Sequence, residues 1–112
     1  MATIETFEKM LEKGPDNALL RYSLANACVS ADRQSDAVEH LRKAVEHDNQ
    51  YSAAWKLLGR CYFDTQDYRN AASAYESGIA VADSNGDLQA GKEMRVFLKR
   101  VKRKLEDKNG ND

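Results

Sequence analysis

Histidine and cysteine are the side chains most suited to holding a metal or acting as nucleophiles, and this chain carries two of each. His40 and His47 form no HExxH motif, and no second pair of ligands stands at metal-binding spacing. Cys28 and Cys61 form no CxxC pair and fall on apolar helical positions that suit a small buried residue. The sequence also lacks a G-x-S-x-G element and a glycine-rich phosphate loop. We therefore predict no enzyme, no metal and no cofactor, and we expect both histidines to be solvated.

Clustered cations are the other groups with binding chemistry. Lys56 and Arg60 lie four residues apart, which places both on one helical face where they could bind an acidic peptide. A denser basic patch lies near the C-terminus and consists of Lys99, Arg100, Lys102, Arg103 and Lys104. Such a patch suits nucleic acid or an acidic membrane surface, although only Phe97 supplies an aromatic ring nearby.

Composition indicates one small globular domain. The chain has 112 residues, of which 42% are apolar and 31% charged, and its net charge is −1. That balance hides an asymmetry, because residues 1–91 hold nine Lys/Arg and fourteen Asp/Glu, whereas residues 92–108 hold eight and three. No apolar run is long enough for a membrane span, and the N-terminus has no signal-peptide pattern. We expect a cytoplasmic protein with reduced, buried thiols.

The elements that must position these residues are all helical. Apolar residues recur at helical spacing in six segments, at about residues 3–13, 17–31, 36–47, 51–64, 68–81 and 87–107. Gly14 and Pro15 end the first segment, and Asp16 and Asp67 are expected N-caps. The run 83–86 predicts a loop, and residues 109–112 a disordered tail.

The stretch from Trp55 to Gly78 contains an internal pattern of large and small residues. A shift of 34 places aligns it with the preceding stretch, so that every small position meets a small one and every large position except Cys28, which meets Tyr62, meets a large one. The aligned pairs are Leu24 with Leu58, Ala25 with Gly59, Ala37 with Ala71, Leu41 with Tyr75, and Ala44 with Gly78. The pattern resembles the tetratricopeptide repeat, a helix–turn–helix unit of about 34 residues, in a small stand-alone form.

This resemblance implies an all-α, right-handed solenoid of antiparallel helix pairs, with about two and a half repeats and a C-terminal capping helix. The expected divisions of the single domain are a half repeat (1–17), two repeats (18–51 and 52–85), a cap (86–108) and the tail (109–112). Small residues at positions 25 and 59 should face those at 37 and 71, which lets paired helices approach closely. The family often has glycine in the turn between paired helices. Asp32 and Gln66 stand there, so the second turn is expected to be strained or differently shaped.

By the same resemblance, the first helices of the repeats should form a concave peptide-binding face, and the chain should be a non-catalytic adaptor or scaffold. The expected binding residues are Tyr22, Asn26, Val29, Lys56, Arg60 and Phe63. Some family members clamp a C-terminal carboxylate. Asn26 matches the clamp's asparagine, but Tyr22 and Leu57 replace its lysine and second asparagine.

The final helix leaves alternatives open. Its apolar stripe and charged remainder suit a cap that keeps the end of a solenoid soluble. The basic patch also allows nucleic-acid or acidic-surface binding. Residues 101–105 are expected to overhang the repeats, which would leave an apolar strip for homodimer formation.

Overall fold

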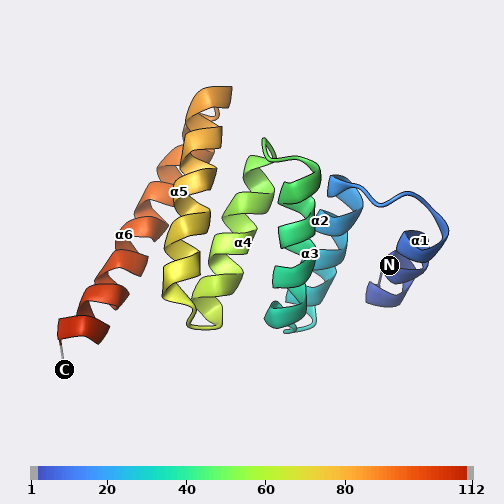
Figure 1. The fold of residues 1–112 in the computed structure, drawn as a ribbon, viewed down its shortest axis with the longest axis horizontal. Coiled ribbons are helices and arrows are strands. Elements are labelled where there is room, and N and C mark those ends of the chain that lie inside the picture. Colours follow the sequence, from blue (N-terminus) through green and yellow to red (C-terminus); the bar gives the residue numbers. More distant parts are fainter. Residues whose placement is uncertain (1–2, 111–112) are drawn as a thin grey trace.

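Six helices and no strand make up residues 3–110, which are the residues that the computed structural model describes, with side chains for residues 3–107. The helices are α1 (Ile4–Lys13), α2 (Ala18–Ser30), α3 (Gln34–His47), α4 (Ser52–Asp64), α5 (Tyr68–Asn85) and α6 (Leu88–Gly110). They stack side by side in chain order along the long axis of a body measuring 48 × 33 × 22 Å (Figure 1). The predicted all-α repeat solenoid is confirmed.

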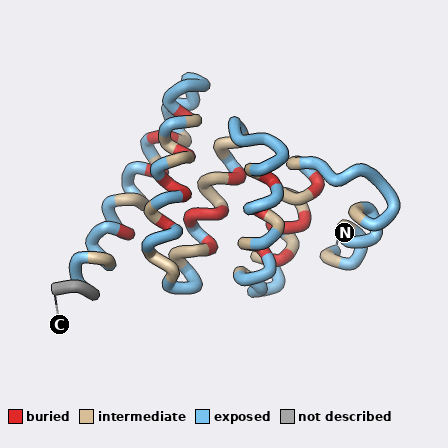
Figure 2. The backbone as a smooth tube through the Cα atoms, in the orientation of Figure 1, coloured by how far each residue is buried: buried red, intermediate tan, exposed pale blue. Residues whose placement is uncertain are grey.

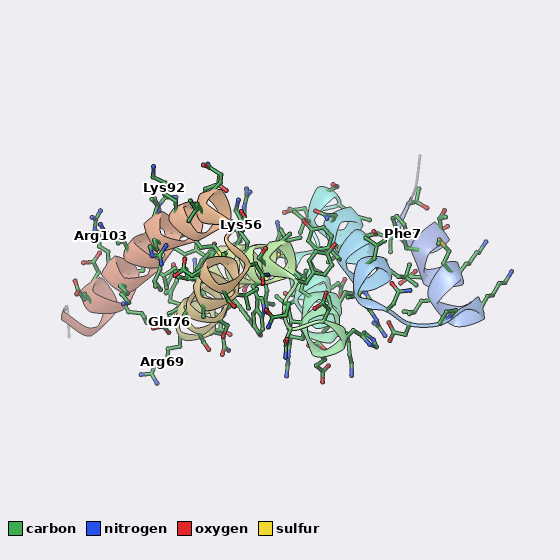
Figure 3. The ribbon with its side chains drawn as sticks, turned by 90° about the horizontal axis from the view of Figure 1, so that it is seen from above. Phe7, Lys56, Arg69, Glu76, Lys92 and Arg103 are labelled. Atoms are coloured by element: carbon green, nitrogen blue, oxygen red, sulfur yellow. The ribbon has the colours of Figure 1, made fainter. Side chains whose placement is uncertain are left out.

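The helices alternate between two layers. Helices α2, α4 and α6 lie toward one side, and α3 and α5 toward the other (Figure 3). Lys56 and Lys92 project from the first side, whereas Arg69 and Glu76 project from the opposite one (Figure 3). Each helix packs mainly on its neighbours in sequence, and α4 also contacts α6. The first side therefore carries three helices whose side chains can act together.

Small residues do allow close helix crossings. Ala25, Ala37 and Ala71 are completely buried. A methyl group added at Gly59 would lie 2.8 Å from ring atoms of Tyr75. The ring that covers Gly59 comes from Tyr75, one turn beyond Ala71 along α5.

Three turns between helices have the same conformation. Asp32, Gln66 and Gly86 have φ values of 60°, 65° and 73°, in the left-handed region. In each turn the following amide donates to a carbonyl five residues earlier, as when Asp67 N–H donates to the carbonyl of Tyr62 at 2.8 Å. The prediction of a differently shaped second turn is therefore wrong, since this hydrogen-bonding pattern imposes the left-handed conformation on glutamine.

Replacing Gln66 with glycine should stabilise the protein by about 1 kcal/mol, because glycine enters the left-handed region without the penalty of a Cβ atom. Chemical denaturation followed by circular dichroism would measure the gain. Gln66→Ala is the control: it keeps the Cβ atom and should give no gain. If Gln66→Gly proved no more stable than Gln66→Ala, the expected strain would be contradicted.

Two helix ends differ from the prediction, and one agrees with it. Helix α5 continues to Asn85 through the expected loop at 83–86, because no proline stops it and Gly86 supplies the left-handed turn. Asn17, and not Asp16, caps α2, with its side chain accepting from the N–H of Leu20 at 2.8 Å. Asp67 caps α5 as predicted.

The C-terminal helix is longer and better covered than expected. The backbone of α6 is helical through Gly110, so the predicted disordered tail is wrong for 109–110, and residues 111–112 lie outside the described part. Val101 has no exposed surface and belongs to a buried cluster with Ala71, Tyr75 and Met94. Leu105 is half-buried and packs against this cluster. The expected apolar overhang at 101–105 is therefore wrong, because residues from the end of α4 and the start of α5, among them Phe63 and Tyr68, belong to the same core cluster and provide cover.

Asp16 links the loop before α2 to two helices. Arg21 donates two hydrogen bonds to its carboxylate, both at 2.8 Å, and His47 Nε2 lies 3.2 Å away. The Arg21 guanidinium also reaches His40 Nδ1 at 3.0 Å, so His40 is half-buried rather than solvated as expected. The hydrogen bonds from Arg21 hold the pKa of Asp16 well below its usual range.

Asp16→Asn should lower the free energy of unfolding at pH 7 by about 1 kcal/mol, as a well-aligned but partly exposed ion pair contributes. A carboxyl whose pKa is lower in the folded chain stabilises above its ordinary pKa and loses that effect as the pH falls. The difference between the two proteins should therefore shrink from about pH 4 toward pH 2. Urea titrations across that range would measure it, and a difference independent of pH would contradict the ionic origin.

Candidate functional site: the groove of α2, α4 and α6

The three helices of the first layer enclose a groove of about 350 Å³. Its lining is Tyr22 from α2, Ala53, Lys56, Leu57 and Arg60 from α4, Tyr75 from α5, and Glu93 and Phe97 from α6. Successive turns of α4 bring residues 53, 56, 57 and 60 onto one face, since residues three and four apart are neighbours on a helix. The groove is thus centred on α4.

Aromatic rings form much of its wall. The rings of Tyr75 and Phe97 stack with centroids 5.7 Å apart and planes 7° from parallel. The guanidinium of Arg100 lies 5.5 Å from the centroid of Phe97. Tyr22 packs against Tyr51 with centroids 5.0 Å apart. Tyr22 and Phe97 are half-buried and leave apolar ring surface against which a ligand side chain can pack, whereas Tyr75 is buried behind them.

Charges at the groove are unevenly neutralised. Lys56 Nζ donates to Glu93 Oε1 at 2.6 Å and so joins α4 to α6. This hydrogen bond lowers the pKa of Glu93, which keeps that carboxylate ionised. Arg60 has a side chain 65% exposed, and its only described ionic neighbour, Asp64, lies 3.9 Å away. Arg60 is therefore the groove cation best placed to meet an acidic ligand.

The predicted peptide-binding residues divide into two sets. Tyr22, Lys56 and Arg60 line the groove, whereas Asn26, Val29 and Phe63 do not. Asn26 is exposed and directs its side-chain amide to the carbonyl of Tyr22 at 3.4 Å. Val29 packs against the buried cluster of α2, α3 and α4 that includes Cys28. The ring of Phe63 packs edge-on against that of Tyr68, with ring centroids 5.4 Å apart.

Three lining residues were missed by the sequence analysis, namely Tyr75, Glu93 and Phe97. Tyr75 was identified from the sequence only as the repeat position equivalent to Leu41, and Phe97 only as the ring near the basic patch. The spacing of Glu93 and Phe97, four residues apart on one helical face, was the available signal.

The basic patch does not form one surface. Arg100 and Lys104 follow Glu93 and Phe97 along the face of α6 that borders the groove, as their spacing requires. Lys99 and Arg103 follow Lys92 along another face. All the patch residues are exposed, namely Lys99, Arg100, Lys102, Arg103 and Lys104. None of the five forms an ion pair with another side chain among residues 3–107.

The thiols are core residues. Cys28 and Cys61 are free and buried, as predicted, and burial raises the pKa of Cys61 to about 11. A thiol with such a pKa is protonated near neutrality and is a poor nucleophile. Among the described residues, no three His, Cys, Asp or Glu side chains are grouped so that they could hold a metal ion. None of the helices in that part of the chain is long and apolar enough to cross a membrane.

Comparison with known proteins agrees with the repeat pattern. The family model "Tetratricopeptide repeat" matches this chain over residues 2–61 and again over residues 33–93. The TPR repeat-containing protein PA0015 of Pseudomonas aeruginosa is 49% identical over 100 residues, which make up 89% of this chain and 95% of that protein. The heat-shock protein cognate co-chaperone sgt12 of Aspergillus fumigatus is 35% identical over 106 residues, which are 95% of this chain but 30% of the co-chaperone.

Solved structures give the same result. The solution structure of protein BPP2914 from Bordetella parapertussis is similar with a TM-score of 0.81 and 40% identity, over 98% of this chain and 96% of that one. The Sgt2 TPR domain from Aspergillus fumigatus has a TM-score of 0.78 and 34% identity, over 95% of this chain and 68% of that one. From the repeated family match and these near full-length similarities, we conclude that the chain belongs to the tetratricopeptide repeat family.

Proposed function

We propose that this chain is a non-catalytic protein-binding module whose α2–α4–α6 groove holds an extended peptide segment of a partner protein. The observation that carries the proposal is the groove itself, where aromatic and aliphatic walls surround the exposed cation Arg60. Rings provide contact area at low entropic cost, and charged groups at the rim fix register and orientation. Its relatives include a co-chaperone, which agrees with an adaptor role. The buried free thiols suit a reducing compartment, and we place the protein in the cytoplasm.

An acidic peptide suits the groove better than a neutral or basic one. Arg60, Arg100 and Lys104 present positive charge along its border, while the nearby carboxylate of Glu93 is already paired with Lys56. A clamp for a C-terminal carboxylate is not proposed, because Tyr22 and Leu57 stand where such a clamp requires lysine and asparagine.

A matched pair of charge reversals tests this proposal. Peptides would first be selected on the wild-type protein from a displayed random library, and the tightest would be synthesised and titrated. Arg60→Glu should weaken binding at least tenfold. Arg42→Glu is the control, since Arg42 is 62% exposed on α3 and has a similar loose ion pair, with Glu39 at 3.8 Å.

Circular dichroism should show both variants equally helical. Equal weakening by the two reversals would indicate attraction to net charge alone and would exclude the groove as the site. Selected peptides without acidic residues would contradict the proposed ligand chemistry while leaving the groove in place.

A second candidate function rests on the exposed cations of α6 that lie away from the groove. We propose that Lys99, Lys102 and Arg103 contact an anionic surface, such as nucleic acid. Phosphate binding weakens steeply with salt, so the affinity for a DNA or RNA duplex should fall sharply between 50 and 200 mM salt. Changing these three residues to alanine should abolish that dependence, and an absence of duplex binding at low salt would exclude this candidate.

A further inference from the structure

A second groove lies at the opposite end of the molecule, between α1 and α2. It has a volume of about 730 Å³ and is lined largely by apolar atoms. The lining includes Phe7 and Met10 of α1 and Leu19 and Leu20 of α2. Met10 and Leu19 are both large exposed apolar residues. Helix α1 contains no buried residue, which Figure 2 shows as the absence of red along it.

The internal repeat indicates that a helix fits this groove. A shift of 34 residues moves Phe7, Met10 and Leu20 onto Leu41, Ala44 and Ala54, all of which are completely buried. Leu41 and Ala44 belong to α3, on which α2 packs, and Ala54 of α4 lies in the same buried cluster as Ala25 of α2. The α1–α2 groove therefore corresponds to the surface of the next unit that α2 covers. Among residues 3–110 no helix covers the α1–α2 groove in the same way.

The contact between Asp16 and His47 indicates which charge a helix in the α1–α2 groove should carry at its N-terminal end. Asp16, just before α2, lies 3.2 Å from His47 on α3. The same shift moves Lys13 onto His47. Lys9 and Lys13 are the charged residues that line the groove, and neither forms an ion pair among residues 3–107. Asp16, just before the start of α2, lies beside His47, and Lys13 is the equivalent of His47. A helix bound in the α1–α2 groove as α2 is bound in the next unit would therefore place a carboxylate at its N-terminal end beside Lys13.

We propose that the α1–α2 groove receives an amphipathic helix of a partner protein, which completes the half repeat. Its aliphatic side chains, spaced three and four residues apart, pack on Phe7, Met10, Leu19 and Leu20. An acidic residue at its N-terminal end pairs with Lys13. This surface is separate from the α2–α4–α6 groove, so the chain can bind an extended segment and a helix at the same time.

The chain itself supplies the probe. A synthetic peptide with the sequence of residues 14–33, carrying Cys28→Ser, has the apolar spacing and the N-terminal carboxylate of a helix that fits this type of groove. Titrated into the isotopically labelled full chain, it should shift the amide resonances of Thr6, Phe7, Met10, Leu19 and Ser23. Leu19→Glu in the protein should weaken binding at least tenfold.

Leu88→Glu is the matched control, because Leu88 is 78% exposed at the start of α6 and Leu19 is 66% exposed near the start of α2. It should leave the affinity unchanged. Lys13→Glu should weaken binding, and a peptide with Asp16→Lys should restore it, which a purely apolar contact would not do.

Three outcomes would overturn the proposal. The first is no shift at millimolar peptide, and the second is equal loss of binding with Leu19→Glu and Leu88→Glu. The third is a wild-type dimer, seen by light scattering at the working concentration, that Leu19→Glu converts to monomer. That result would make a second copy of this chain the occupant.

Discussion

Replacing Tyr75 with alanine is expected to lower the free energy of unfolding by about 3–5 kcal/mol. Only 1% of Tyr75 is exposed, and its ring covers Gly59 on one helix and stacks on Phe97 of another. Truncation removes this burial and leaves a cavity where three helices meet. Small domains have stabilities of about 5–15 kcal/mol, so the variant should melt roughly 15 °C or more below the wild type. Thermal and urea unfolding followed by circular dichroism would measure the loss.

Tyr75→Phe separates packing from the hydroxyl group. The described contacts give this hydroxyl no hydrogen-bond partner among the protein's side chains, and burial raises the pKa of the phenol, which keeps it protonated. The phenylalanine variant should therefore remain within about 1 kcal/mol of the wild type. A large loss in both variants would show that the hydroxyl group, and not the ring, stabilises the fold.

Gly59→Leu should destabilise the protein by about 3 kcal/mol or more, despite the better helix propensity of leucine. Glycine costs a helix about 1 kcal/mol relative to alanine, so local propensity favours the change. Against it, the first added carbon would lie 2.8 Å from two ring atoms of Tyr75 and 2.9 Å from a third. The ring is enclosed and cannot move aside, so α4 and α5 must separate, and overpacking outweighs propensity.

Ala80→Leu is the control for added size, because Ala80 is exposed on α5 and the larger side chain should have little effect there. The combined variant Gly59→Leu/Tyr75→Ala tests the mechanism. Removing the ring makes room for the leucine, so the loss in the combined variant should be clearly less than the sum of the two single losses. Full additivity would mean that the leucine clashes with something other than Tyr75.

Sequence periodicity predicts most of the fold and part of the site. The shift of 34 residues relates α2 to α4, and it places Tyr22, Lys56 and Arg60 on one side, where the groove brings them together. The shift of 34 residues does not predict which residues of α6 face α4. Helix α5 continues past the expected break, and this changes the register of the helix that follows. Lys56 donates to Glu93, 37 residues further along, whereas the position equivalent to Lys56 by the repeat shift is Ala90.

The spacing of Glu93 and Phe97 shows that they share a face of α6, but this change of register explains why that face could not be assigned to the groove in advance. Their contacts depend on where α5 ends, and only the turn at Gly86 determines that position. Asn26, Val29 and Phe63 were misplaced for a different reason. A helical face is wider than one groove, and tertiary packing decides which of its side chains border the opening.

The weak attachment of α1 has a consequence for the order in which the protein opens. Because each helix packs mainly on its sequence neighbours, the stack behaves as a nearly one-dimensional array in which ends open before the middle. Backbone amides of α1 should exchange with deuterium first, through a local opening that leaves α2–α5 closed. Amides of α4 and α5, which share the buried crossing at Gly59, should exchange last and report global unfolding. Since most contacts are local in sequence, refolding should be fast, and α1 should dock at the end of it.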